Sequence, residues 1–137
     1  ASAIAKCIYE MFNLKVPILS ILIGEGGSGG ALGLAVANEV WAMENSTYSI
    51  LSPEGFASIL WKNEKRAKEA ANLMKMTAKD LLDLGVIEKI LPEGNGASEF
   101  KVITDFLQVQ ILDFIYNMSL KNEDEIVASR ETRFRSF

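Results

Sequence analysis

The chain has 137 residues, of which 49% are hydrophobic and 23% charged, as in a single globular domain. Its net charge of −4 disfavours nucleic acid as the main substrate, because phosphate binding needs clustered positive charge. The sequence has no histidine and a single cysteine, Cys7, which excludes His-dependent nucleophilic catalysis, His-ligated metals and a Cys-rich zinc site within these residues.

The first fifty residues are predicted to alternate between helices and strands. An amphipathic helix is expected over 2–14, and the apolar, β-branched run at 16–23 is typical of a strand buried on both faces. A glycine-rich loop follows, and small residues then predict a short helix over 30–38. Two short strands are expected at 39–43 and 47–51.

The second half is predicted to be mostly helical. Ser-Pro-Glu at 52–54 is typical of a helix start, Thr77 with Asp80 predicts a capping box, and Gly85 should end that helix. Further elements are expected as a helix over 63–75, a strand over 86–91, and helices over 98–118 and 121–135. One broad face of the long helix carries Phe100, Ile103, Phe106, Leu107, Ile111, Phe114 and Ile115. Alternating strands and helices predict an α/β fold with a mainly parallel sheet.

Five glycines lie within seven residues, from Gly24 to Gly30, between the predicted strand and helix. Glycine is entropically costly to order, so such a cluster needs a physical reason. A G-x-G-x-x-G spacing begins at Gly24 and Glu44 lies 20 residues beyond it, as in dinucleotide-binding loops, but 30–38 is short for a crossover helix. A P-loop is excluded because no Lys-Ser/Thr pair follows the glycines.

A third interpretation of the glycines is an oxyanion hole. The first amides of a helix have no intrahelical acceptor and carry the positive end of its dipole. Without side chains at Gly26, Gly27, Gly29 and Gly30, a substrate oxygen could reach these N–H groups. This chemistry requires neither histidine nor a metal. The structural alternative is that the glycines only allow the helix to pack closely on the strand.

Residues 15–62 resemble the alpha subunit of the bacterial-type acetyl-CoA carboxylase carboxyltransferase. The motifs that carry the resemblance are GEGGSGGAL at 24–32 and STYSILSPEGFASILWK at 46–62. A weaker match continues through LLDLGVIEKILPEGNGA at 81–97, and the last forty residues match only in pattern. The resemblance implies a crotonase (ClpP/crotonase-like) fold of β-β-α units. The family carries a further segment upstream. Residues 1–137 are therefore expected to be the C-terminal part of a single carboxyltransferase domain that lacks its N-terminal portion.

The resemblance implies a carboxyl transfer from carboxybiotin to acetyl-CoA, which gives malonyl-CoA for fatty acid synthesis. Gly29 and Gly30 would donate their backbone N–H groups to the biotin ureido oxygen. Other substrate-binding residues would be Gly26, Gly27, Ser28, Ser52, Pro53, Glu54 and Gly55. Negative charge develops on the ureido group and on the acetyl-CoA enolate, and neither charge needs a protein nucleophile.

The resemblance also implies partners. Biotin would be attached to a biotin carboxyl carrier protein and not to this chain. A carboxyltransferase beta subunit, in an α2β2 assembly, would supply the thioester oxyanion hole and the zinc site, and biotin carboxylase would complete an ATP-binding complex. No metal is expected in this chain, no membrane is expected as a partner, and a lone cysteine fits a cytoplasmic location.

Several alternatives stay open at this level. Residues 52–55 could simply begin a helix. The basic residues Lys62, Lys65, Arg66 and Lys68 could face coenzyme A phosphates or form a solvated helix face. For the whole chain, the competing functions are a crotonase-fold acyl-CoA hydratase or isomerase and a non-catalytic assembly subunit.

Overall fold

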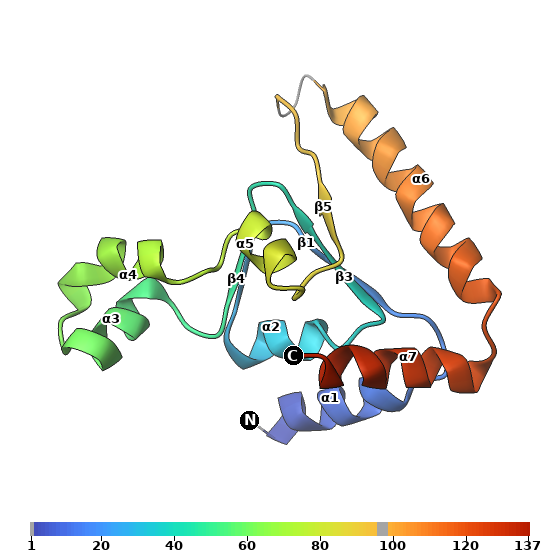
Figure 1. Cartoon of the computed structure of the whole chain (residues 1–137), viewed down its shortest axis with the longest axis horizontal. Helices are drawn as coiled ribbons and strands as arrows, with labels where there is room; N and C mark the ends of the chain where they lie inside the picture. Colours follow the sequence, from blue (N-terminus) through green and yellow to red (C-terminus); the bar gives the residue numbers. More distant parts are fainter. Residues whose placement is uncertain (1, 96–98) are drawn as a thin grey trace.

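A computed structural model describes residues 2–95 and 99–137. Figure 1 shows a small central body of strands with helices around it and one helical arm that extends to the left. The elements are α1 (Ser2–Asn13), β1 (Leu19–Leu22), β2 (Glu25–Gly27), α2 (Ser28–Leu34), β3 (Glu39–Met43), β4 (Thr47–Ser49), α3 (Pro53–Trp61), the 3-10 helix η1 (Glu64–Arg66), α4 (Ala67–Leu73), α5 (Ala78–Asp83), β5 (Lys89–Leu91), α6 (Phe100–Ser119) and α7 (Glu123–Arg135).

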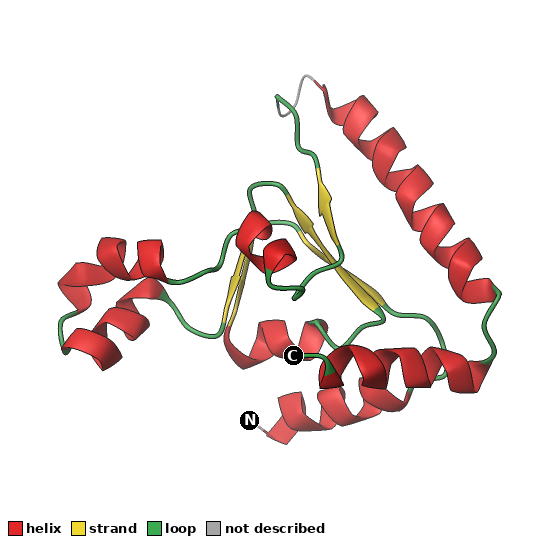
Figure 2. Ribbon diagram, viewed as in Figure 1, coloured by secondary structure: helices red, strands yellow, loops and turns green. Residues whose placement is uncertain are grey.

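The strands form two parallel sheets, drawn in yellow in Figure 2. One sheet has the order β1-β3-β5, with Ile21 opposite Trp41, and the other pairs β2 with β4. The chain therefore repeats a β-β-α unit, because β1 and β3 enter the first sheet while β2 and β4, which follow them, enter the second. This confirms the predicted α/β class, the parallel pairing and the β-β-α units.

The region around the glycines differs from the sequence prediction in three ways. The run at 16–23 contains only a four-residue strand, β1, which is half-buried because it lies at an edge of its sheet. The predicted loop contains a strand, β2, in which Gly26 pairs with Tyr48. The helix predicted over 30–38 is α2, which begins at Ser28 and ends at Leu34, and the buried residues Ala35 to Asn38 connect it to β3.

Other helices and strands are present but shorter than predicted. The strand expected at 47–51 ends at Ser49, and the one expected at 86–91 is β5. The helix expected over 63–75 divides into η1 and α4. Gly85 does end its helix, with a φ of +72° that favours glycine. The end of the 81–97 segment and the start of the predicted 98–118 helix lie outside the described residues.

The predicted capping box begins α5. The Thr77 hydroxyl accepts a hydrogen bond from the Asp80 backbone N–H (3.2 Å) and donates one to the Asp80 carboxylate (2.7 Å). The bond from the Thr77 hydroxyl is the main reason that the pKa of Asp80 lies below its ordinary value, and nearby Lys75 adds to the effect. The ionised carboxylate is therefore favoured in the folded state.

This shift predicts a pH dependence. The contribution of the cap to stability should be fully present above about pH 4, where an unfolded Asp is ionised, and it should be lost as the pH falls through the lower folded pKa. We expect Asp80→Asn to lower the melting temperature at pH 6 and the gap from wild type to narrow below about pH 4. Thermal unfolding between pH 6 and pH values below about 4 measures this difference in melting temperature, with Asp83→Asn on the same helix as the control. A gap that does not change with pH would contradict the assignment.

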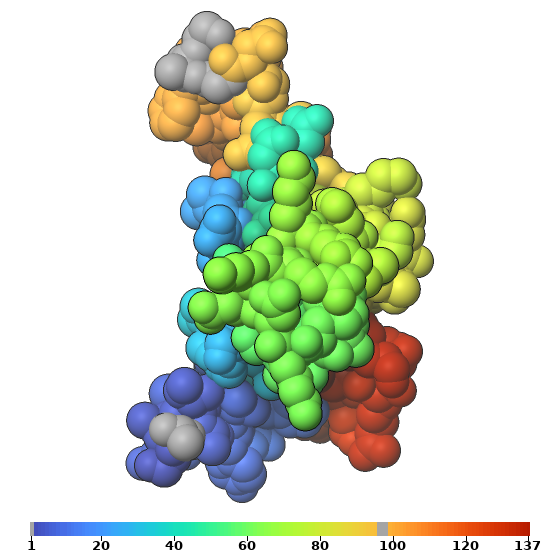
Figure 3. Space-filling model, turned by 90° about the vertical axis from the view of Figure 1, so that its left-hand side faces the viewer, coloured from blue at the N-terminus to red at the C-terminus, as the bar shows by residue number. Residues whose placement is uncertain are grey.

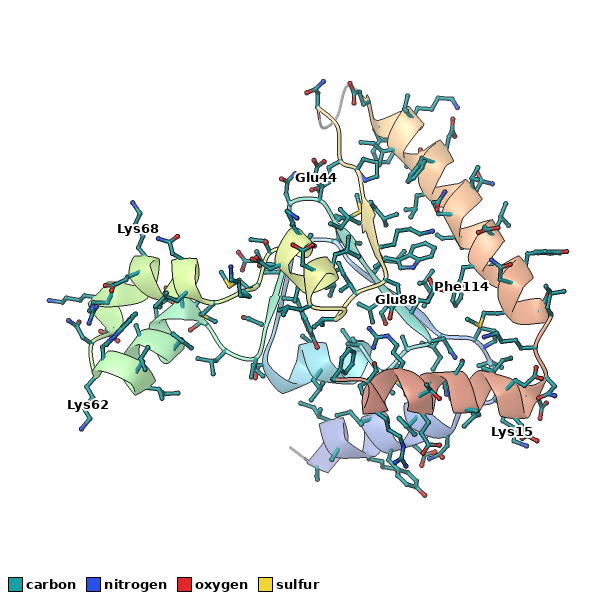
Figure 4. All side chains as sticks on the ribbon, viewed as in Figure 1. Lys15, Glu44, Lys62, Lys68, Glu88 and Phe114 are labelled. Carbon is teal, nitrogen blue, oxygen red and sulfur yellow. The ribbon has the colours of Figure 1, made fainter. Side chains whose placement is uncertain are left out.

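Two apolar clusters form the core. In the first, Val40 and Ala42 of β3 pack with Leu81 of α5 and Ile87. In the second, Trp41 meets Phe114 of α6 edge to face, with ring centroids 6.0 Å apart. Figure 4 shows Phe114 directed from α6 toward the sheet. The two clusters hold α5 and α6 on the three-stranded sheet.

The predicted apolar face of α6 is only partly covered. Leu107 and Ile111 are partly buried beside Phe114, whereas Phe100 and Ile115 are 68% and 53% exposed. The outer part of this face has no contact that buries it within the described residues. We therefore predict that this outer part packs against another chain or an upstream segment.

Arg130 joins α7 to α1, which lie side by side in Figures 1 and 2. Its side chain is fully buried. The guanidinium donates hydrogen bonds of 2.8–3.1 Å to the carbonyl oxygens of Met11, Phe12, Leu14 and Val16 and to the side-chain oxygen of Asn38. Burial lowers the pKa of Arg130, but the negative end of the α1 dipole and these oxygens stabilise its charge. The end of α1 is thus capped by a residue more than a hundred positions away.

Candidate functional site

The candidate site lies where β2 passes directly into α2. Gly29 and Gly30 are the second and third residues of this helix. Ser28, its first residue, has a φ of +63°, which is uncommon for a residue with a side chain. A left-handed residue followed by helical ones turns successive backbone N–H groups toward one concavity, an arrangement that binds anions. The glycine pattern indicated this junction, but no sequence signal pointed to the conformation of Ser28.

The amides of Gly29 and Gly30 are available for a ligand. Among the described residues, no backbone hydrogen bond outside the helices and strands has either N–H group as its donor, and the first amides of a helix have no acceptor within it. Gly27, the residue before the helix, contributes no side-chain cap. Gly29 is half-buried and Gly30 is exposed, so both can be reached from outside the chain. This is the arrangement of unpaired donors that an oxyanion hole requires.

Internal packing explains only part of the glycine cluster. A Cβ atom added to Gly26 would lie 3.0 Å from the Tyr48 ring, so this glycine allows β2 to lie against β4. At Gly24, Gly29 and Gly30, an added Cβ would meet nothing within 4 Å. The space beside the two amides is therefore open, and the chain itself does not require glycine there.

A cavity of about 900 Å³ begins beside Ser28. Its walls come from α2, β4, α3, α5 and the end of α7, and include Ser28, Leu32, Tyr48, Phe56, Leu60 and Arg133. Burial raises the pKa of Tyr48, an effect that the charge of Arg133 partly offsets. Arg133 pairs with Glu88 at 2.5 Å and donates to the Val86 carbonyl (2.6 Å). The cavity is thus a mainly apolar space in which the one buried charge is already paired.

A smaller cavity of about 310 Å³ lies on the other side of the junction, between β1, β2 and α2. Gly26 lines this cavity together with Ser20, Glu25 and Ala31. Neither Gly29 nor Gly30 lines either of the two cavities, and Gly27 lines neither of them. The two amides therefore lie outside the walls of both cavities.

Residues 52–55 lie at the start of α3. The Ser52 hydroxyl accepts a hydrogen bond from the Gly55 backbone N–H (3.1 Å), Pro53 occupies the first helical position, and Glu54 lies in the first turn. None of the four residues lines either cavity. They form the helix start that the sequence predicted, and their role in substrate binding stays a prediction.

The described residues contain no group of three or more His, Cys, Asp or Glu side chains placed to bind a metal. In the same part of the chain, no helix is both long and apolar enough to span a bilayer. Helix α2 itself carries no acidic residue in its first turn.

Comparison with known proteins finds similarity to carboxyltransferase subunits of acetyl-CoA carboxylase. The whole chain, residues 1–137, matches the family model described as acetyl co-enzyme A carboxylase carboxyltransferase-like. It is 52% identical over 136 residues to the acetyl-coenzyme A carboxylase carboxyl transferase subunit alpha of Streptococcus pyogenes serotype M5 (strain Manfredo), covering 98% of this chain and 52% of that protein. It is 51% identical over 136 residues to the acetyl-coenzyme A carboxylase carboxyl transferase subunits beta/alpha of Natranaerobius thermophilus, covering 98% of this chain and 22% of that protein.

The fold also matches solved structures. A chain of a Pseudomonas malonate decarboxylase hetero-tetramer in complex with coenzyme A superposes with a TM-score of 0.66 at 16% identity, covering 98% of this chain and 55% of that one. At this identity the likeness describes the fold, which is the crotonase fold. The chain spans about half the length of the Streptococcus relative.

Proposed function

Because the chain belongs to the acetyl-CoA carboxylase carboxyltransferase-like family, we propose that it is part of a carboxyltransferase alpha subunit. The proposed reaction moves a carboxyl group from carboxybiotin, held by a biotin carboxyl carrier protein, to acetyl-CoA, and the product is malonyl-CoA. The proposed setting is the cytoplasm, where this reaction would supply fatty acid synthesis. The observation that carries the proposal is the pair of unpaired amides at Gly29 and Gly30.

In this proposal the chain binds one oxygen atom and stabilises the negative charge that grows on it. The N–H groups of Gly29 and Gly30 would donate to the ureido oxygen of biotin. Their positions are set before the reaction by β2 and by the conformation of Ser28, so little reorganisation is needed. The open space beside both glycines leaves room for this oxygen. When bound, carboxybiotin supplies the carboxyl group itself.

The remaining binding roles rest on position. Ser28 lines the large cavity and Gly26 the smaller one, so both could contact substrate. Gly27 lies between them on the same short segment. Residues 52–55 would act indirectly, because they fix the start of α3, which forms one wall of the large cavity.

The other half of the site would come from a beta subunit in an α2β2 assembly. The open surface around the Gly29 and Gly30 amides suits a site that a second chain completes. In the Natranaerobius relative, the beta and alpha subunits are named as one protein, which fits an alpha part that works directly beside a beta part. Biotin carboxylase would be the further partner that loads the carrier.

Two other functions were considered. A crotonase-fold hydratase or isomerase would be expected to carry carboxylates on the helix that follows the oxyanion hole, and the α2 sequence SGGALGL has none. A non-catalytic assembly subunit would be favoured if the loop amides were satisfied within the chain, but Gly29 and Gly30 have no internal acceptor among the described residues. Both observations support the carboxyltransferase proposal.

The test is an activity assay on the full-length alpha protein and its beta partner. We expect biocytin-dependent turnover of malonyl-CoA only when the two are mixed, because either chain alone lacks one of the two charge-stabilising donor sets. Missing such donors costs roughly one power of ten in rate per 1.4 kcal/mol. Hydration of crotonyl-CoA by the alpha protein alone would instead support the hydratase, and a mixture without turnover would support an assembly role.

A further inference from the structure

The end of the helical arm carries more basic than acidic side chains, although the protein as a whole is acidic. The arm consists of α3, η1 and α4, and α3 packs against the other two. We call residues 61–69 the arm tip. Within these nine residues lie the positive side chains Lys62, Lys65, Arg66 and Lys68 and two acidic ones, whereas the whole chain has a net charge of −4. Figure 3 views the molecule from this end, with the arm in green projecting toward the reader.

The three lysines of the arm tip are available for a partner. Arg66 is already engaged, because it pairs with Glu69 at 2.5 Å and its guanidinium lies 3.9 Å from the centre of the Trp61 ring. Lys62, Lys65 and Lys68 are exposed and take part in none of the ion pairs found among residues 2–95 and 99–137. Figure 4 shows Lys62 and Lys68 leaving the arm on opposite sides.

The backbone that presents these lysines is ordered by specific contacts. Lys62 has a φ of +52°, in the left-handed region where a glycine would be less strained. The Asn63 side chain accepts a hydrogen bond from the Lys65 backbone N–H (3.1 Å). Phe56 packs edge to face on Trp61, with ring centroids 6.4 Å apart. A lysine held at a glycine-favouring position on a fixed scaffold suggests that its charge is used.

The arm also borders the route to the candidate site. Phe56, Ile59 and Leu60 of α3 line the same cavity as Ser28, the residue that precedes the two available amides. Leu60 adjoins the arm tip in sequence, so a partner bound at the arm tip would lie next to one wall of this cavity. A long, mostly apolar appendage on that partner could then follow the cavity wall as far as Ser28, the residue next to Gly29 in the chain.

We propose that the arm tip is a docking site for an acidic surface of the protein domain that carries biotin. This inference rests on the proposed function, because it assigns a location to the carrier in that reaction. A protein surface fits better than a single phosphate group, since Lys62 and Lys68 diverge and do not converge on one point. Spread, unpaired charges of this kind accelerate association and select partners of opposite charge.

The experiment measures binding of the biotinylated carrier domain to the full-length alpha protein in complex with its beta subunit. We expect K62E/K65E/K68E to raise the dissociation constant of the carrier domain at least tenfold at low ionic strength. The increase should be much smaller at high ionic strength, because salt screens exposed charges. The control is K6E/K101E/K121E, which changes the net charge equally at exposed lysines outside the arm. The milder K62Q/K65Q/K68Q should give a smaller loss, and thermal unfolding checks that all variants fold.

Equal carrier affinity in the arm-tip and control variants would overturn the inference. So would a raised KM for acetyl-CoA with unchanged carrier binding, because the lysines would then serve the phosphates of coenzyme A. Failure of the proposed function is seen separately, in the wild-type complex with malonyl-CoA and free biocytin, which needs no carrier domain. An active wild-type complex whose carrier binding is insensitive to the arm tip would disprove the docking site and leave the reaction standing.

Discussion

Replacing Gly30 with valine should reduce carboxyl transfer by about 10²- to 10³-fold while leaving the fold intact. The side chain would project into the open space beside the amides, where an added Cβ meets nothing within 4 Å. It would therefore clash with the bound ureido oxygen and not with the protein. Valine and glycine are both modest helix formers, so little change in stability is expected. The measurement is kcat for biocytin-dependent turnover in the complex with the beta subunit.

The matched control is Gly24→Val. This glycine belongs to the same cluster, also has open space around its Cβ position, and lies on the other side of β2 from the amides. Its substitution should affect turnover by less than a factor of a few. A comparable loss of turnover in both variants would mean that a larger side chain anywhere in the glycine segment impairs the enzyme. If the Gly30→Val enzyme had a kcat near that of the wild type, the two amides would not take part in the mechanism.

Replacing Arg130 with methionine should cost about 3–5 kcal/mol of folding free energy. The guanidinium is fully buried and supplies hydrogen bonds to four carbonyl oxygens and to Asn38. Methionine can fill some of the space but donates no hydrogen bond. The carbonyl oxygens of Phe12, Leu14 and Val16 would lose the bonds that Arg130 supplies, and Asn38 would keep only the bond from the Ile18 N–H. Because domains are typically stable by only about 5–15 kcal/mol, this loss would be large. Denaturant unfolding of the full-length protein measures it.

Arg135→Met provides the control for Arg130. Arg135 lies on the same helix, pairs with Glu131 four residues earlier, and its side chain is 77% exposed. Exposed pairs of this kind contribute little, so a change within about 0.5 kcal/mol is expected. If both substitutions had the same small effect, the network around Arg130 would not hold α7 on α1.

Local signals predicted the elements well. Ser52 with Pro53, and Thr77 with Asp80, begin their helices as the sequence indicated, because these caps depend on residues three positions apart or fewer. Strand 39–43 was predicted with its observed bounds. The glycine cluster correctly marked a strand-to-helix junction, and the use of its amides as an oxyanion hole stays a prediction.

Features that depend on distant residues could not be predicted from the sequence. Gly26 lies in a strand because it pairs with Tyr48, a contact between segments 22 residues apart. The Arg130 network joins residues separated by more than a hundred positions, and its charge would have suggested an exposed site. The large cavity requires α3, β4 and α7 to meet, which no local pattern encodes. The family resemblance supplied the fold that periodicity alone could not.

The most direct test of the account is a crystal structure of the full-length alpha protein with its beta subunit and bound biocytin. We expect the ureido oxygen to lie about 2.7–3.1 Å from the backbone nitrogens of both Gly29 and Gly30, the range for a hydrogen-bonded oxyanion hole. Biocytin bound with its ureido oxygen on other donors, and with both glycine amides facing solvent, would contradict the central claim.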